Sequence, residues 1–446
     1  MPFEFTGEDI AQFLSELIRI DTSNPPGNEL EAAKLVAEKL REYGIESVIL
    51  ESEPKRGNVI ARVRGREEGP TVLLLSHLDV VPAKPEEWKV HPFSGEIKNG
   101  FVWGRGALDC KGGVAVEMFT LIQLAKEEAI KGTLVFAATA DEEKGGLKGV
   151  KWLLENRPDL IKADYVINEG GGFEIPVNGR SIFTVQTAEK GVYWFKLRFK
   201  GTPGHASMPS AYDNAIAKAA KAIDMITRVK PKICPTPHAK KFIESLLTAM
   251  GRGWIAKLLL SPLTADIALS RIPDRSKAAF IEALLRNTLT PTVVRGGYKE
   301  NIVPSDCELT VDCRLLPGFD ERWVEEYLRG VLRGIDYELS FIHKEPPTES
   351  PLDTLLFKAI NKALVKQVPN VTVTPYMSPG GTDSRYFRRV GVVAYGFIPF
   401  RADVPFSELM KMVHGVNERI SVKNLEFSYK TLTTVLREFY GLLSRT

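Results

Sequence analysis

Histidine and carboxylate side chains follow three apolar runs of this sequence. The run "TVLLLS" ends just before His77 and Asp79, "TLVFAATAD" ends before Glu142 and Glu143, and "ADYVIN" ends before Glu169. Such runs predict buried strands of a mostly parallel sheet, and the carboxyl ends of parallel strands face one crevice. The sequence therefore predicts that these side chains converge in space.

Two more candidate residues lie in loops. Asp109 is in the glycine-rich "GRGALDCKGG", and His414 comes a little beyond the strand-like "VVAYGFIP". Taken singly, a histidine or aspartate at a strand end is more often a cap or a satisfied loop residue than a ligand. Taken together, two histidines and at least three carboxylates would repel one another strongly without cations, and zinc favours this donor set. We therefore expect a metal site.

The number of carboxylates predicts two ions rather than one. Asp109, Glu143 and Glu169 supply three negative charges against four positive charges from two divalent ions, which leaves one for a bound hydroxide. One carboxylate can bridge two ions about 3.5 to 4 Å apart, and Asp109 is the natural bridge because its loop precedes a helical pattern. Zinc is the first expectation, and cobalt and manganese accept the same ligands.

Asp79 and Glu142 are expected to support the metal ligands. Residues i and i+2 of an extended segment point the same way, so Asp79 can accept the second ring N–H of His77 and fix its tautomer. Neighbouring residues point in different directions, so one glutamate of the pair Glu142 and Glu143 can bind metal while the other reaches the metal-bound water. The glutamate that does not bind metal is the expected general base.

The elements that must position these residues fall into two groups. In the first part of the chain, helical patterns such as "EAAKLVAEKLREYG" alternate with apolar strands, which predicts an α/β domain with a mostly parallel sheet flanked by helices. After Ala188 the order becomes strand, helix, strand, strand, helix, strand, the split βαβ or ferredoxin-like α+β arrangement. We expect a catalytic domain of residues 1–188 and 346–446, interrupted by a smaller domain of residues 189–345. The smaller domain would carry a helical insertion at about 231–289.

Composition excludes several classes of protein. The 446 residues contain 59 Lys and Arg against 56 Asp and Glu, a formal charge of +3, which gives no reason to expect nucleic-acid or membrane binding. The amino terminus lacks the basic start and apolar centre of a secretory signal, so we expect a cytoplasmic protein. The four cysteines show no disulfide-rich or CxxC pattern and are expected to be reduced thiols.

The order of the motifs resembles that of a known family. The motifs are "SHLDVVPA", "GRGALDCKGG", "ADEEKGG", "NEGGG", "GTPGHAS", "GGTDSRYF" and "HGVNERI", preceded by "LIRIDTSNPPGNE". The sequence resembles the di-zinc amidohydrolases and peptidases that include aminoacylase, acetylornithine deacetylase, succinyl-diaminopimelate desuccinylase and carboxypeptidase S. It looks closest to the branch of carboxypeptidase S and the N-acyl-amino-acid hydrolases.

The resemblance implies a role for each candidate residue. His77 and Glu169 would bind one zinc, Glu143 and His414 the other, and Asp109 would bridge them, with Glu142 as the general base. The smaller domain would be a lid that mediates homodimerisation in many relatives. His205, in "GTPGHAS", would stabilise the oxyanion, in dimeric relatives across the interface. The large insertion at 231–289 departs from the minimal lid and leaves the dimer mode open.

Substrate contacts are expected in the lid and in one late loop. The resemblance implies Asn301 and Arg314, and arginine suits a bidentate grip on a carboxylate. The loop "PGGTDSR" could offer backbone donors, from Gly380, Gly381 and Thr382. The alternatives are an ordinary ion pair for Arg314, and a tight turn in which Asp383 pairs with Arg385.

Four other residues are expected to be structural. Packing is the interpretation for Cys110 and His91, and a surface position for His238 and His343.

The predicted function is hydrolysis of amide bonds in N-acyl amino acids or short peptides. The alternative within the enzyme class is a carboxypeptidase or dipeptidase that requires a free carboxyl terminus. A non-catalytic binding protein is a weaker alternative, because all five ligand positions, Asp79 and Glu142 are present.

Overall fold

A computed structural model describes residues 3–443 and divides the chain into two compact units. Unit 1 comprises residues up to Thr187, Ser350–Tyr376 and the residues from Thr382 onward. Unit 2 comprises Ala188–Glu349 and Met377–Gly381. The loop "PGGTDSR" is thus divided, with Gly380 and Gly381 in unit 2 and Thr382 in unit 1.

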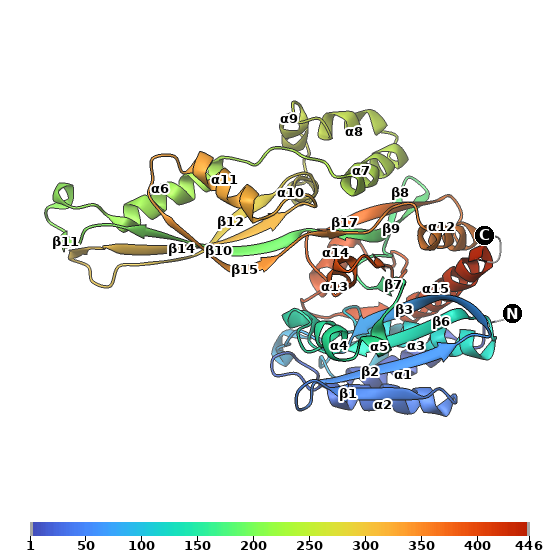
Figure 1. Cartoon of the computed structure of the whole chain (residues 1–446). Helices are drawn as coiled ribbons and strands as arrows, with labels where there is room; N and C mark the ends of the chain where they lie inside the picture. Colours follow the sequence, from blue (N-terminus) through green and yellow to red (C-terminus); the bar gives the residue numbers. More distant parts are fainter. Residues whose placement is uncertain (1–2, 444–446) are drawn as a thin grey trace. The chain divides into compact units, whose positions relative to one another are not determined.

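Unit 1 is built on a mixed sheet whose centre is parallel (Figure 1). Its strands lie in the order β1 (Ser47–Glu51), β2 (Gly57–Arg64), β6 (Lys131–Thr139), β3 (Glu67–His77), β7 (Tyr165–Asn168), β18 (Val393–Gly396) and β9 (Arg180–Glu189). The β6–β3, β3–β7 and β7–β18 pairs are parallel, and the β1–β2, β2–β6 and β18–β9 pairs are antiparallel. β8 (Glu174–Val177) and β17 (Val371–Ser378) also pair with β9. The predicted α/β class with a mostly parallel sheet is confirmed.

Helices cover both faces of this sheet, because its strands are apolar on both sides. Val72 and Leu74 of β3 pack into one core, and Leu73 and Leu75 pack into the other. The first core includes residues of α1 (Gly7–Ile18), α2 (Glu29–Glu42), α3 (Lys111–Lys126), α12 (Leu355–Gln367) and α15 (Val422–Leu443). The second includes residues of α4 (Val150–Asn156), α5 (Pro158–Ile161) and α13 (Ser384–Arg389). Burial on both faces explains the continuous run of leucines that leads to His77.

A small sheet and a helix complete unit 1 near its late loops. The sheet has the order β19 (Arg419–Ser421), β5 (Phe101–Trp103) and β4 (Ile97–Lys98). The helix α14 (Phe406–Met412) directly precedes the loop that carries His414.

Unit 2 has the split βαβ topology that the sequence predicts. Its four-stranded antiparallel sheet has the order β12 (Thr288–Gly296), β14 (Asp306–Leu315), β10 (Gly191–Lys200) and β15 (Glu338–Glu345). The helices α6 (Ala215–Arg228) and α11 (Glu321–Val331) share one hydrophobic core with this sheet. β11 (Gly204–His205) pairs with β13 (Ile302–Val303), and β16 (Thr348–Glu349) pairs with the end of β9.

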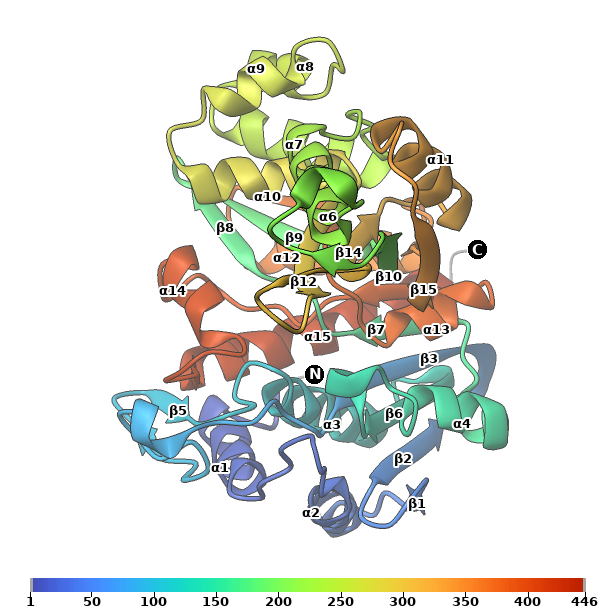
Figure 2. The ribbon, with the colours of Figure 1, turned by 90° about the vertical axis from the view of Figure 1, so that its left-hand side faces the viewer.

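The insertion of unit 2 is a group of four helices, α7 to α10 (Figure 2). They are α7 (Pro237–Ala249), α8 (Gly253–Leu259), α9 (Ala265–Ser270) and α10 (Arg275–Leu285). Strand β12 begins at Thr288, so the helical segment ends a few residues before the expected limit near 289.

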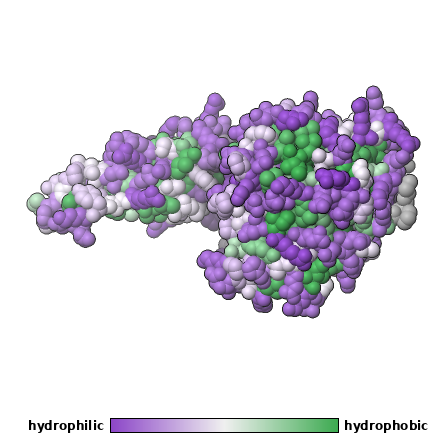
Figure 3. All heavy atoms as spheres, turned by 90° about the horizontal axis from the view of Figure 1, so that it is seen from below, coloured by the Kyte–Doolittle hydropathy of each residue, from purple (hydrophilic) through white to green (hydrophobic). Residues whose placement is uncertain are grey.

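Polar side chains cover most of the face that Figure 3 draws, with smaller apolar patches between them. Within residues 3–443, every helix is too short or too polar to cross a bilayer.

Candidate metal centre

The carboxyl ends of three neighbouring strands of unit 1 carry the candidate residues. His77 is the last residue of β3, Glu142 and Glu143 lie in the 3-10 turn that follows β6, and Glu169 follows β7. These strands are adjacent in the order β6-β3-β7, so their ends meet at one edge of the sheet. The predicted convergence on this edge is what the sheet topology produces.

Each of the five candidate ligands lies within 4 Å of at least one other. Nε2 of His77 is 3.0 Å from Oδ1 of Asp109 and 3.8 Å from Oε1 of Glu169. Nε2 of His414 is 3.2 Å from Oδ2 of Asp109 and 3.1 Å from Oε2 of Glu143. The two carboxylate oxygens of Asp109 therefore face different histidines.

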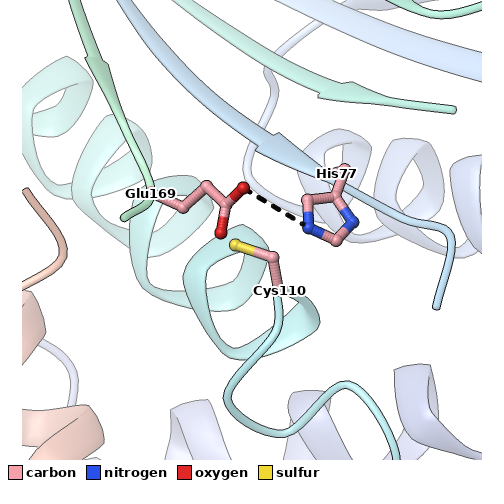
Figure 4. Close-up of side chains that lie close together, drawn as sticks. All are labelled: His77, Cys110 and Glu169. Carbon is pink, nitrogen blue, oxygen red and sulfur yellow. Dashed lines mark ion pairs between the residues drawn. The ribbon is translucent and has the colours of Figure 1, made fainter. Parts of the chain in front are cut away.

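Cys110 also lies in this cluster, beside His77 and Glu169 (Figure 4). Donor atoms of these three residues all lie within 4.8 Å of one another. Cys110 is fully buried, and burial together with the charge of Glu169 raises the pKa of its thiol well above the ordinary value. All four cysteines are free thiols.

The ionisable groups of the cluster shift one another's pKa values. Burial and the neighbouring Asp109 charge raise the pKa of Glu169 to about 8, and burial with the Glu169 charge raises the pKa of Glu142. Hydrogen bonds with Asp109 and Glu143 raise the pKa of His414 to about 10. Although burial acts in the opposite sense, hydrogen bonds with the two histidines lower the pKa of Asp109 below its ordinary value. Positive charge is therefore favoured among these crowded carboxylates.

Asp79 contacts both His77 and the loop that carries the two glutamates. Nδ1 of His77 is 2.9 Å from the main-chain oxygen of Asp79 and 3.5 Å from its carboxylate Oδ1. A carbonyl oxygen can only accept, so Nδ1 is the donor and Nε2 faces the cluster. The Asp79 carboxylate accepts the main-chain N–H groups of Glu142, at 3.0 Å, and of Glu143, at 3.2 Å, and the Nδ2 of Asn24 at 2.8 Å. Asp79 therefore fixes the loop that carries both glutamates as well as the ring of His77.

A buried polar network behind Asp79 was not identified from the sequence. Nη2 of Arg56 donates to Glu29 at 2.6 Å and to Asp141 at 3.0 Å, and Asn24 donates to the same Asp141 oxygen at 3.1 Å. Asp141 has a positive φ of 71°, which aims the following residues toward the cluster. The motif "TSNPPGNE" contains Asn24 and Glu29 and could have indicated part of this network, whereas no sequence signal points to Arg56.

In unit 2, His205 and Asn301 lie on one small ribbon. His205 pairs with Ile302, and the N–H of Ala206 donates to the main-chain oxygen of Asn301 at 3.1 Å. Nδ1 of His205 is 2.7 Å from the hydroxyl of Ser207. Both His205 and Asn301 are exposed.

Arg314 forms an ion pair with Asp312, as in the alternative to a substrate-binding role. Its Nε and Nη2 donate to the two carboxylate oxygens of Asp312, at 2.7 and 3.0 Å. The guanidinium is thus already engaged in a bidentate pair.

Hydroxyl groups of Ser378 and Thr382 accept hydrogen bonds in and next to the loop "PGGTDSR". The N–H of Gly380 donates to Oγ of Ser378 at 3.1 Å. In unit 1, Oγ1 of Thr382 accepts the N–H of Ser384 at 3.2 Å and an Asn168 amide hydrogen at 3.4 Å. Asp383 lies 4.0 Å from Arg385, at the outer limit of an ion pair.

The remaining histidines lie outside the cluster. His91 packs against Phe93, and His343 is exposed beside Trp194. The expectation of a surface position is wrong for His238, which is 3% exposed and lies 3.0 Å from Glu349. An apolar helix face and one acidic partner are enough to bury it.

Fold and site together define a class of protein. A mostly parallel sheet that gathers two histidines and several carboxylates at its carboxyl edge is typical of metallohydrolases. The model of the peptidase family M20/M25/M40 matches residues 73–438. The chain therefore belongs to this family, and it is a hydrolase of amide bonds.

Individual relatives agree with this assignment. The chain is 30% identical over 369 residues to N-fatty-acyl-amino acid synthase/hydrolase of Xenopus tropicalis, covering 79% of this chain and 69% of that protein. It is 26% identical over 421 residues to aminoacylase-1A of Rattus norvegicus, covering 91% and 89%. The crystal structure of an M20 family metallo-carboxypeptidase from Sulfolobus solfataricus has the same fold, with a TM-score of 0.70 at 22% identity over 97% and 99% of the two chains.

Proposed function

We propose that unit 1 binds two divalent ions and that the protein uses them to hydrolyse N-acyl amino acids or short peptides. His77 and Glu169 would hold one ion, Glu143 and His414 the other, and Asp109 would be shared. The observation that carries this proposal is the position of Asp109, whose two oxygens lie 3.0 Å from His77 and 3.2 Å from His414.

The residues fit such ions in donor chemistry and in charge. Oε1 of Glu143 is buried and has no hydrogen-bond partner among residues 3–443, as expected for an atom reserved for another ligand. Burial and the Asp109 charge raise the pKa of Glu169, and hydrogen bonds with Asp109 and Glu143 raise the pKa of His414, so the cluster favours added positive charge. Imidazole and carboxylate suit zinc first, and cobalt and manganese accept the same set.

Glu142 is the proposed general base. Bound ions would polarise the scissile carbonyl and lower the pKa of the attacking water. Glu142 would take the proton of that water and return it to the leaving amine. Its main-chain N–H is fixed by Asp79 at 3.0 Å, so the glutamate is presented on a held loop.

Unit 2 is the proposed lid. His205 would stabilise the oxyanion, and Asn301 would contact the substrate, as the family resemblance implies. Arg314 already binds Asp312 through Nε and Nη2, so a substrate carboxylate would have to use its other guanidinium edge, and backbone donors are proposed from Gly380, Gly381 and Thr382. We also propose homodimerisation through unit 2 and, from the four free thiols, a cytoplasmic location.

The substrate class is supported by relatives whose names describe action on N-acyl amino acids. The test is release of free amine by the zinc-loaded protein from N-acetyl amino acids, long-chain N-acyl amino acids and unblocked dipeptides. Preference for the acylated compounds supports the proposal, and a preference among chain lengths identifies the acyl group. Preference for dipeptides or blocked peptides with a free carboxylate would replace it with a peptidase, and no release from any compound would contradict hydrolysis of this class.

A further inference from the structure

The two histidines of the cluster are held very differently. His77 is 2% exposed, ends a central strand and is bonded through Nδ1. The His414 side chain is 55% exposed and lies in the loop after α14. The backbone of His414 is left-handed, with φ of 56°, and so is that of Asn417, with φ of 60°. Such backbone is unfavourable for residues other than glycine, so this loop needs external support.

A buried ion pair supplies that support. Glu418 is fully buried and accepts Nη1 of Arg105 at 2.7 Å, the N–H of Leu108 at 2.8 Å and the N–H of Asp109 at 3.0 Å. Arg105 is 3% exposed, and its Nη2 donates to the main-chain oxygen of Gly415 at 2.6 Å.

These contacts close a ring between the two loops. Glu418 binds the backbone of Asp109 itself, and Arg105, from the loop of Asp109, binds the residue after His414. Neither Arg105 nor Glu418 contacts His77 or Glu169 through any hydrogen bond that the described residues form. The ring therefore acts on one side of the cluster.

We propose that Arg105 and Glu418 are positioning residues that set the separation of Asp109 from His414 and thereby the affinity for the second ion. This inference rests on the proposed two-metal function. The ion held by His77 and Glu169 shares Asp109 with the second ion, but its other two ligands lie at strand ends that the pair does not touch, so the pair should affect it less. The second ion depends on an exposed loop with left-handed residues, which the side chains of Arg105 and Glu418 tie to the loop of Asp109. Supporting contacts of this kind typically change metal affinity 10- to 100-fold.

A matched control exists in the same unit. Glu174 is also a buried glutamate, which accepts Nε of Arg401 at 2.8 Å, the N–H of Ala402 at 3.0 Å and the hydroxyl of Ser181. It thus makes the same kinds of bonds as Glu418 without touching any of the five candidate ligands. Glu174→Gln measures the general cost of neutralising a buried glutamate.

The experiment is a zinc titration of the metal-free full chain against a competing chelator, with melting temperature and amine release measured in parallel. We expect two bound ions in the unaltered protein. In Glu418→Gln the first ion should lose little affinity, and the second should bind about 10- to 100-fold more weakly. kcat should fall with occupancy of the second site and return with excess zinc, while KM changes little. Glu174→Gln should bind both ions as the unaltered protein does.

A second variant keeps the test informative if Glu418→Gln does not fold. Arg105→Lys retains the charge beside Glu418, but an ammonium cannot bind Glu418 and Gly415 in the fixed fork of a guanidinium, so the second ion should again be weakened. Equal weakening of both ions, unchanged binding of both, or the same loss in Glu174→Gln would overturn the positioning role. Fewer than two ions in the unaltered protein would instead contradict the proposed two-metal function.

Discussion

Replacing Glu142 with glutamine should nearly abolish turnover while leaving both metal sites intact. Glutamine has the size of glutamate, and the main-chain N–H that donates to Asp79 at 3.0 Å is retained. Glu142 forms none of the close contacts that join His77, His414, Asp109, Glu143 and Glu169. The substitution therefore removes proton transfer and little else.

The magnitude follows from the role. A positioned general base contributes typically about 10²- to 10⁴-fold to the rate, which corresponds to about 3 to 5 kcal/mol of the barrier. Burial and the Glu169 charge raise the pKa of Glu142. A raised pKa favours both proposed steps, in which this carboxyl takes a proton from water and keeps it until the amine leaves. Both halves of the reaction are lost with glutamine, so we expect a loss in kcat toward the larger figure.

The assay is steady-state amine release by zinc-loaded protein, with the zinc content of each sample measured. Glu155→Gln, an exposed position on α4, is the control and should keep full activity. If Glu142→Gln with two bound ions retained kcat within tenfold of the unaltered protein, another group would have to be the base. Loss of zinc from the variant would instead show that Glu142 is a ligand.

Three further outcomes are expected. Removal of metal by a chelator should abolish amine release, and added zinc should restore it, because the proposed reaction needs bound ions to polarise the carbonyl and activate the water; persistent activity in metal-free samples would contradict this. Cys110→Ser should bind two ions as before, because burial raises the pKa of the thiol and keeps it protonated, and the cobalt-loaded unaltered protein should show no sulfur-to-cobalt absorption band in the near ultraviolet. Burial lowers the pKa of Lys190 to about 7, against 10.5 in the unfolded chain. Between these two pH values the unfolded chain binds more protons than the folded chain. The free energy of unfolding should therefore rise by up to about 3 kcal/mol from pH 7 to pH 9. Lys190→Met should remove this rise in urea unfolding, whereas an unchanged slope would show that Lys190 stays charged on the oxygens of Ala283 and Arg286.

The sheet edge was predictable because periodicity and strand order are local properties of the sequence. A run such as "TVLLLS" predicts a strand buried on both faces, and the end of such a strand lies at the crevice of a parallel sheet. The convergence of His77, Glu143 and Glu169 follows from these two facts. The left-handed backbone of Asp141 and His414 gives no comparable signal, because neither residue is a glycine.

The contacts behind the candidate ligands were less accessible to sequence reasoning. The period of a strand gives the direction of the Asp79 side chain but not its partners, which are N–H groups of the loop after β6. Arg56 meets Asp141 across 85 residues of chain, and Arg105 meets Glu418 across 313. Such pairs depend on how loops pack, and no spacing rule connects them.

The fold and the chemistry of the site have one physical origin. Apolar strands and helices exclude water from the edge where Asp109, Glu143 and Glu169 meet, and the same exclusion makes carboxylates so close together costly unless positive charge joins them. Protons on Glu169 and His414 would reduce this cost, since burial and the Asp109 charge raise the pKa of Glu169 and hydrogen bonds with Asp109 and Glu143 raise the pKa of His414. Bound cations would replace those protons with a larger positive charge. Ion binding would therefore also change the pKa of Glu142, because the same charges act on its carboxylate. His414, like Asp109, lies in a loop whose position the main sheet does not fix, and the buried pair of Arg105 and Glu418 joins these two loops.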